Sequence, residues 1–153
     1  KMKAVIQRVK HASVTIDGNL YSKIGHGLLV LFCVEKGDTN QELEWMCRKI
    51  PALRIFEDEN DKMNRSLLDT GGEILAVSQF TLAGNCKKGT RPSFDNAAEP
   101  AFANQMYEKF CTGLAEGGIS VKTGVFAAMM DVGLCNDGPV TIILEKNSEK
   151  GLA

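Results

Sequence analysis

The first third of the chain has the hydrophobic pattern of a β-sheet. Apolar and polar residues alternate over residues 4–9, and residues 13–16 are rich in β-branched side chains. An Asp-Gly pair at residues 17–18 is typical of a hairpin turn, and a short strand over residues 20–24 is expected to follow it. Residues 28–34 are apolar without a break, which predicts a central strand covered on both faces.

Two later segments have the period of an α-helix. Over residues 43–50 the apolar positions follow i, i+3, i+4, i+7 spacing, and the preceding Thr39 and Glu42 have the spacing of a capping box. Pro51 is expected to end or kink this helix. A longer apolar stripe predicts a second helix over residues 97–116, with Asn96 as its cap and two glycines after its end.

The rest of the chain predicts more strands and one overall architecture. We expect strands at residues 53–56, 74–82, 120–123, 129–135 and 140–145, with Asn-Asp-Gly-Pro at 136–139 breaking the last pair. The fold class predicted is mixed α/β: a strand-rich sheet or barrel-like layer covered by two main helices. No repeat or linker stands out, so one domain is expected over residues 2–146, with a flexible tail at 147–153.

Composition narrows the function classes. The chain has 153 residues, of which 44% are hydrophobic and 24% charged, with a net charge of -1. These values are ordinary for a globular domain and exclude a globally basic nucleic-acid binder, although they leave room for a local basic patch. The five cysteines form no C-x-x-C motif, which argues against a disulfide framework or a zinc site. With no signal-peptide pattern and no apolar run of about 18 residues, a cytoplasmic protein without membrane contact is expected.

The common catalytic signatures are missing. The sequence contains no G-x-S-x-G elbow, P-loop, dinucleotide fingerprint or H-E-x-x-H. His11 and His26 lie beside predicted turns and are interpreted as exposed or structural. The acidic residues at 58–61 are interpreted as solvated. We therefore assign no metal ligand and no cofactor.

Three segments remain unusual, each with an ordinary alternative. Ser-Gln-Phe-Thr-Leu at 78–82 is compatible with an amphipathic strand. The basic segment at 87–92 is compatible with a solvated loop, but its Lys and Arg side chains also suit phosphate oxygens. Asn-Asp-Gly-Pro-Val-Thr at 136–141 is compatible with a hairpin turn. Composition and spacing alone do not make these segments an enzyme.

Taken together, the segments resemble the D-aminoacyl-tRNA deacylase family. Ser-Gln-Phe-Thr-Leu and Gly-Pro-Val-Thr are the two signature motifs of that family, and here they stand in the same order and at a similar separation. The match extends over most of the chain, at residues 4–9, 12–14, 27–30, 53–56, 62–64, 78–82, 88–89, 91–94 and 136–141. One departure is Phe126-Ala127-Ala128, where the family has Phe-Gly-Ala. If that glycine has a positive φ, Ala127 is expected to cost stability locally.

The resemblance implies a hydrolase that cleaves the ester between a D-amino acid and the terminal ribose of tRNA. It implies a homodimer with active sites at the subunit interface. The catalytic residues implied are Ser78, Gln79, Phe80 and Thr81. The N–H groups of Phe80 and Thr81 are candidates for an oxyanion hole. Thr81 is either a nucleophile or a positioning group, and because no base is evident for it, attack by water helped by the ribose 2′-hydroxyl is preferred.

The resemblance also implies how the hand of the substrate is judged. A cis Gly138–Pro139 unit from the partner subunit, with Arg8 and Met130 assigned to the same substrate-binding group, is expected to clash with an L side chain and to admit D side chains. Glycine has no side chain to clash, so glycyl-tRNA is expected to be hydrolysed as well.

The remaining expectations concern partners and alternatives. Lys87, Lys88 and Arg91 are expected to bind tRNA phosphates, with no DNA partner. Two other functions stay open at this point. One is an editing deacylase for a mischarged L-aminoacyl-tRNA, with a trans Gly-Pro bond and a wider pocket. The other is a non-catalytic module that binds the tRNA 3′ end.

Overall fold

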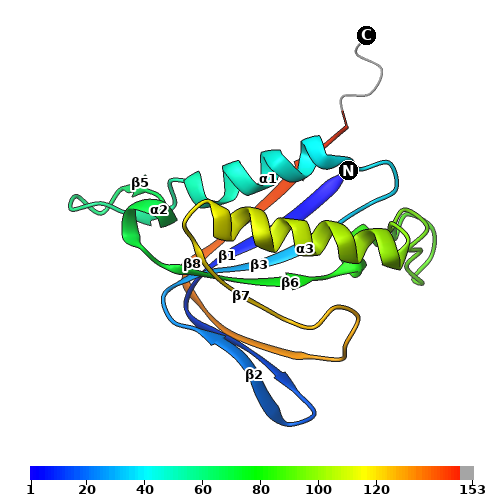
Figure 1. Ribbon diagram of the computed structural model, residues 1–153, viewed down its shortest axis with the longest axis horizontal. Coiled ribbons are helices and arrows are strands. Elements are labelled where there is room, and N and C mark those ends of the chain that lie inside the picture. Colours follow the sequence, from blue (N-terminus) through cyan, green and yellow to red (C-terminus); the bar gives the residue numbers. More distant parts are fainter. Residues whose placement is uncertain (149–153) are drawn as a thin grey trace.

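The computed structural model describes residues 1–148 and shows a mixed α/β fold, as predicted (Figure 1). Residues 149–153 of the expected tail lie outside the described residues. The elements in chain order are β1 (Met2–Ile16), β2 (Asn19–Ile24), β3 (Gly27–Cys33), α1 (Asn40–Ala52), β4 (Phe56–Glu57), β5 (Met63–Arg65), α2 (Leu67–Thr70), β6 (Glu73–Ser78), the 3₁₀ helix η1 (Phe80–Ala83), α3 (Pro100–Glu116), β7 (Ser120–Thr123) and β8 (Asp131–Lys146).

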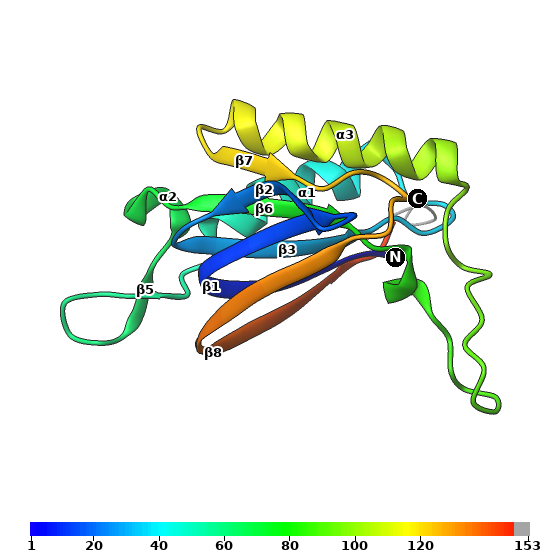
Figure 2. The ribbon, with the colours of Figure 1, turned by 90° about the horizontal axis from the view of Figure 1, so that it is seen from below.

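The main sheet is built around the long first strand. Its order is β2-β1-β3-β6-β7, and β8 also pairs with β1. The pairs of β1 are antiparallel, whereas β3, β6 and β7 run parallel to one another. Both β1 and β8 bend sharply, so the sheet folds over into a nearly closed, barrel-like layer (Figures 1 and 2). Helices α1 and α3 cover one face of it.

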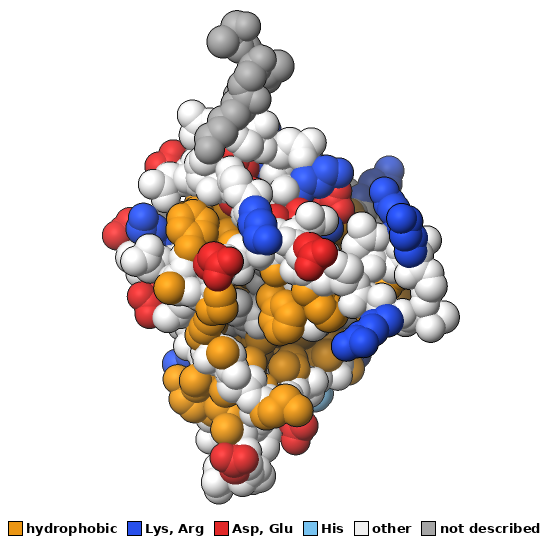
Figure 3. All heavy atoms as spheres, turned by 90° about the vertical axis from the view of Figure 1, so that its right-hand side faces the viewer, with side chains coloured by type: hydrophobic (Ala, Val, Ile, Leu, Met, Phe, Trp, Pro, Cys, Tyr) orange, Lys and Arg blue, Asp and Glu red, His pale blue; other side chains and the backbone are white. Residues whose placement is uncertain are grey.

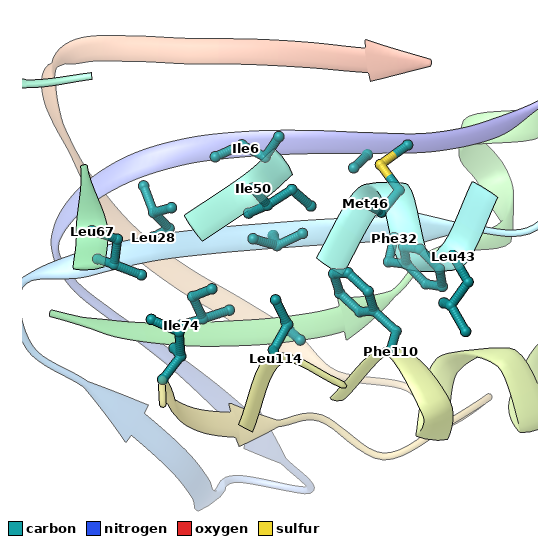
Figure 4. Packing of buried hydrophobic residues seen from close by; sticks show 14 of the residues in the cluster. Ile6, Leu28, Phe32, Leu43, Met46, Ile50, Leu67, Ile74, Phe110 and Leu114 are labelled. Atoms are coloured by element: carbon teal, nitrogen blue, oxygen red, sulfur yellow. The ribbon is translucent and has the colours of Figure 1, made fainter. Parts of the chain in front are cut away.

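The larger core lies between the sheet and these two helices (Figure 4). Sheet residues Ile6, Leu28 and Phe32 meet Met46 of α1 and Phe110 of α3, and all five are fully buried. The rings of Phe32 and Phe110 stack with centroids 4.1 Å apart. Burial of this kind contributes roughly 1.5–3 kcal/mol for each large side chain, so these contacts together hold both helices against the sheet.

A second apolar cluster occupies the other face of the same strands. Leu29 of β3 and Leu75 and Val77 of β6 alternate with residues of the larger core and pack instead against the end of β1 and β2. Strand β3 is therefore buried on both faces, which confirms the expectation drawn from its unbroken apolar run.

The first helix follows its sequence signals. Thr39 and Glu42 form the predicted capping box at the start of α1, and Pro51 lies in its last turn. The second helix differs at its start, because α3 begins at Pro100 and Asn96 does not cap it. Proline suits the first turn of a helix, where its missing N–H has no intrahelical partner to lose.

Several strand predictions were wrong in extent. The strand expected over residues 74–82 ends at Ser78, and the chain then turns into η1. Of residues 53–56 only Phe56 is in a strand, since the carbonyl of Ile55 accepts a side-chain hydrogen bond instead of a ladder bond. The two last strands are one bent strand, β8. His11 lies within β1 opposite Cys135, not beside a turn, while His26 does lie between β2 and β3.

Within residues 1–148, no helix is both long enough and apolar enough to cross a bilayer.

Candidate active site

The first signature segment leaves the end of a central parallel strand. After Ser78 the backbone N–H of Gln79 still donates to the carbonyl of Phe32 (2.8 Å), and the next residues form η1. The first intrahelical bond of η1 runs from the N–H of Leu82 to the carbonyl of Gln79. By position, the N–H groups of Phe80 and Thr81 precede that bond and have no intrahelical acceptor. Two adjacent donors of this kind are suited to stabilising a developing oxyanion.

The Thr81 side chain is exposed, and within residues 1–148 its hydroxyl makes one hydrogen bond to another side chain. Its Oγ1 accepts a hydrogen bond from the Gln79 amide Nε2 at 3.0 Å. An amide nitrogen cannot take up a proton from a hydroxyl at neutral pH. Among residues 1–148 no His, Asp, Glu or Lys side chain is hydrogen-bonded to Thr81. The geometry within one chain therefore positions Thr81 without activating it as a nucleophile.

Two aromatic rings and a thiol surround the same turn. Phe80 is 58% exposed and meets Phe94 edge to face, with ring centroids 5.3 Å apart. Beneath them, the buried thiol of Cys33 lies 3.8 Å from the carbonyl oxygen of Phe80. Burial is the main reason why the pKa of Cys33 is raised to about 11. The thiol is therefore neutral and packs the turn from below.

The second signature segment forms a wide bulge in β8. Gln7 pairs with Thr141 and Val9 pairs with Asn136, so the four residues 137–140 face the single residue Arg8. The Gly138–Pro139 peptide bond is cis. Gly138 has a φ of +125°, and a Cβ there would lie 3.0 Å from Nη2 of Arg8, so glycine is the residue that fits.

Arg8 holds this bulge from inside the protein. Its side chain is buried, its Nε donates to the carbonyl of Asp137 (3.2 Å) and its Nη1 donates to the carbonyl of Ile55 (2.7 Å). The carboxylates of Asp137 and Glu57 lie 3.5 and 3.8 Å from the guanidinium. The planar fork of arginine allows one side chain to reach these groups together. The structure thus places Arg8 against the Gly-Pro segment, as the resemblance implies.

Asn136 also holds the bulge, although it is not among the site residues expected from the sequence. Its Nδ2 donates to the main-chain oxygen of Arg8, opposite the bulge on β1 (2.9 Å), and to that of Val140 at the end of the bulge (3.0 Å). The one available signal was its place directly before the Asp-Gly-Pro segment.

The two signature segments lie far apart within one chain. The backbone of Gln79 is hydrogen-bonded to Phe32, and Phe32 pairs with Ala4 of β1. The bulge instead faces Arg8, which is four residues after Ala4 on the same strand. Strands β3 and β1 also stand between β6 and β8. At about 3.3 Å per residue and about 4.8 Å per strand, the separation is on the order of 15–20 Å. Figure 2 shows the sharp bend of β8 at one end of the molecule and the loop after η1 at the other.

Met130 lies on the side of the first segment. Its sulfur accepts a hydrogen bond from the N–H of Val125 (3.4 Å), and its side chain packs on the cluster that contains Val77. Within one chain it is therefore near Ser78 and not beside Gly138–Pro139.

The basic residues expected to bind tRNA lie on a projecting loop (Figure 2). A pair of backbone hydrogen bonds between Asn85 and Ser93 closes this loop at its base. Lys87, Lys88 and Arg91 are all exposed on it. The segment is thus a closed hairpin that holds three positive side chains beyond the body of the protein.

Ala127 has a φ of +63°, the left-handed conformation that favours glycine. The local cost expected for an alanine in this place is therefore present. No group of three or more His, Cys, Asp or Glu side chains in residues 1–148 is arranged to bind a metal ion.

The chain is similar to known proteins over nearly its whole length. The family model described as D-Tyr-tRNA(Tyr) deacylase matches residues 5–145. The chain is 60% identical over 152 residues to the D-aminoacyl-tRNA deacylase of Geotalea uraniireducens, covering 98% of each chain. It is 56% identical over 145 residues to that of Pelobacter propionicus, covering 95% of this chain and all of the other.

Solved structures show the same fold. One named c-Myc DNA Unwinding Element Binding Protein superposes with a TM-score of 0.90 at 45% identity, covering 95% of this chain and 99% of that one. A probable eukaryotic D-amino acid tRNA deacylase superposes with a TM-score of 0.79 at 17% identity, covering 94% and 98%. The family model and these relatives define the class, an ester hydrolase that acts on aminoacyl-tRNA. The chain belongs to the D-aminoacyl-tRNA deacylase family.

Proposed function

We propose that two copies of this chain together form each active site, with the Thr81 segment from one copy and the β8 bulge from the other. The observation that supports this is the separation of the two segments, on the order of 15–20 Å within one chain by strand geometry. The groups around one ester carbon must lie within a few ångströms of it, so one chain cannot supply both. Exposed apolar side chains gather on one face of the protein, a surface suited to a second copy (Figure 3).

In this arrangement the bulge judges the hand of the substrate. Arg8 and Asn136 donate hydrogen bonds to the bulge carbonyls of Asp137 and Val140, and Asn136 also bonds the bulge to β1, so the bulge backbone is a stiff reference surface. A D side chain points away from Gly138–Pro139, whereas an L side chain collides with that backbone. Because the D side chain is not gripped, many D-amino acids are accepted, and glycine, which has no side chain, is accepted too.

Water is the attacking group in the proposed reaction. Its oxygen adds to the ester carbonyl while the N–H groups of Phe80 and Thr81 stabilise the oxyanion. The ribose 2′-hydroxyl relays a proton, the bond between carbonyl carbon and ribose oxygen breaks, and that oxygen leaves as a hydroxyl. The products are the free amino acid and tRNA. Thr81, held by Gln79, positions the substrate.

The nucleic acid that we propose is the acceptor end of tRNA. The name of the structure at 45% identity describes binding to DNA for that protein. In this chain the net charge is -1, and the exposed basic residues of the projecting loop provide a local patch for phosphates without sequence readout. We also propose a cytoplasmic location, where aminoacyl-tRNA is used.

One set of assays tests the proposal. D-tyrosyl-tRNA and glycyl-tRNA are expected to be hydrolysed, and L-tyrosyl-tRNA to survive. Hydrolysis of L-tyrosyl-tRNA instead supports the editing alternative, and binding without hydrolysis supports the non-catalytic module. Replacing the terminal 2′-hydroxyl with hydrogen is expected to abolish turnover, and undiminished hydrolysis contradicts the relay. Sedimentation is expected to show a dimer, and an active monomer contradicts the shared site.

A further inference from the structure

A hollow of about 610 Å³ opens beside the end of η1. It is separate from the bulge of β8. Ala83 and Gly84 form part of its wall, and the backbone N–H of Gly84 donates to the carbonyl of Thr81 at 3.0 Å. The hollow therefore begins within one turn of the residue that positions the ester. Other residues that line it include Lys3, Lys36, Asn85, Cys86, Lys87 and Asn96.

The lining has more positive than negative charge. Lys3 lies 3.5 Å from the buried carboxylate of Glu35, and its Nζ also donates to the carbonyl of Leu82 (3.4 Å). Lys36 and Lys87 are exposed, and neither has a carboxylate within 4.0 Å in the part of the chain that the structure describes. Glu35 is the carboxylate in the lining and is already engaged by Lys3. Two ammonium groups thus remain available to an anion.

The other groups around the hollow suit a short single strand of nucleic acid. Asn85 and Asn96 supply amide groups at its wall. The rings of Phe80 and Phe94 do not line the hollow, but they contact each other beside Gly84, where a Cβ would lie 3.2 Å from the Phe94 ring. Aromatic faces next to cationic side chains are a common way to bind unpaired bases and their phosphates without sequence preference.

We propose that this hollow binds the phosphate groups that precede the terminal adenosine of tRNA, with Lys36 and Lys87 as the phosphate ligands. The proposal rests on the proposed function, because it needs the ester to lie at Thr81. A chain esterified there must place its last internucleotide phosphates one or two nucleotides away, and the lysine-lined hollow begins within one turn of Thr81. Lysine binds phosphate as a point charge, so this contact anchors every tRNA alike. Lys88 and Arg91, further out on the loop, are then left for the acceptor stem.

Lys36 is the sharper residue to test. Its backbone N–H donates to the carbonyl of Asn96 (2.9 Å), a contact that truncation of the side chain leaves in place. We compare Lys36→Ala with Lys23→Ala, an exposed lysine of β2 outside the hollow. Each is assayed on D-tyrosyl-tRNA and on D-tyrosyl-adenosine, which has no phosphate.

The expected result is a coupling between enzyme and substrate. Lys36→Ala should lose about tenfold more kcat/KM on the tRNA substrate than on the adenosine ester. For tRNA binding by this variant, the slope of log K against log salt concentration should be shallower by about one. Lys23→Ala should show neither effect. Equal losses of Lys36→Ala on both substrates overturn the proposal.

A second measurement does not depend on activity. Cys86 is exposed and lines the hollow, so its alkylation by N-ethylmaleimide reports occupancy. The ribotrinucleotide CpCpA should slow that alkylation, less so at high salt, whereas adenosine should not. If CpCpA inhibits deacylation but does not slow the alkylation of Cys86, the proposal that the hollow binds the phosphates is overturned. Failure of the wild-type protein to hydrolyse D-tyrosyl-tRNA in the same preparation contradicts the proposed function instead.

Discussion

The Nε atom of Arg8 lies 3.2 Å from the carbonyl oxygen of Asp137, so a buried side chain of the first strand braces the bulge in the last one. The other end of the guanidinium is tied to the carbonyl of Ile55, just before β4. The shape of the bulge therefore depends on three distant parts of the chain that meet at one charged group.

Replacing Arg8 with Lys should impair activity although the charge is kept. An ammonium cannot donate to the carbonyls of Ile55 and Asp137 in the fork geometry, so we expect kcat/KM on D-tyrosyl-tRNA to fall about tenfold or more. Arg8→Ala should also lower the free energy of unfolding by about 1–3 kcal/mol, because it removes the buried donor to the carbonyls of Ile55 and Asp137. Steady-state kinetics and urea unfolding measure the two effects.

Arg54→Lys is the matched control for Arg8→Lys. Arg54 is exposed and donates to one carbonyl, that of Asn64 at 3.1 Å. Its replacement should leave kcat/KM close to the wild-type value. Wild-type activity in Arg8→Lys would show that the brace is dispensable.

Asn136→Asp should disrupt the bulge without changing side-chain size. The amide nitrogen Nδ2 becomes a carboxylate oxygen that faces the carbonyls of Arg8 and Val140, so two hydrogen bonds are replaced by repulsion. We expect a loss of about 1–3 kcal/mol in unfolding free energy and a matching fall in D-tyrosyl-tRNA hydrolysis. Asn147→Asp, at an exposed position after β8, should change neither. An unaltered unfolding free energy in Asn136→Asp would show that the Asn136 hydrogen bonds do not hold the bulge.

Thr81→Ala should retain most of the catalytic rate. Its hydroxyl has the Gln79 amide as its partner and no base, so removal should cost less than about tenfold in single-turnover deacylation, whereas loss of a nucleophile costs about 10³-fold or more. Thr90→Ala in the exposed loop provides the comparison. A thousandfold loss in Thr81→Ala would establish Thr81 as the nucleophile.

Ala127→Gly should stabilise the protein. Ala127 has a φ of +63°, which costs an L-residue roughly 1 kcal/mol that glycine avoids. We expect Tm to rise by about 2–4 °C in calorimetry. The neighbouring Ala128 has no positive φ, so Ala128→Gly should lower Tm through the added freedom of the unfolded chain. A lower Tm for Ala127→Gly would mean that this strain is offset elsewhere.

Stability should decline at alkaline pH because of three thiols. Burial is the main cause that raises the pKa of Cys33, Cys47 and Cys111 to about 11 each. Above an unfolded-state pKa near 9 the unfolded chain loses these protons first, so it is favoured as pH rises from about 9 to 11. Urea unfolding between pH 8 and 10 should show this fall. The triple replacement of these cysteines with alanine should flatten it, and an unchanged slope would assign the effect to other groups.

The architecture was predictable where periodicity is strong, and less so at the site. Strand β3 and helix α1 were predictable from the unbroken apolar run of β3 and the capping box of α1, because several residues in each segment favour the same structure. Phe80 and Leu82 have side chains common in strands, so the four-residue turn η1 had no detectable signal. A short 3₁₀ turn depends on what the chain meets in space, here the carbonyl of Phe32 and the ring of Phe94.

The bulge could not be derived from local pattern for a similar reason. Gly138 and Pro139 are turn formers, and their sequence predicts a break. The strand continues because hydrogen bonds from Arg8 and Asn136 hold the extra residues as a bulge. Strand β8 is therefore unbroken. Likewise, Lys36 lies far in sequence from Lys87, and only the folded chain lines one hollow with both.

Strand β1 is made first and β8 last, yet they pair along nearly their whole length. A ribosome that synthesises this protein must release almost the entire polypeptide before Arg8 can meet Asp137. The surface that we propose to judge the hand of the substrate therefore cannot form until β8 has left the ribosome.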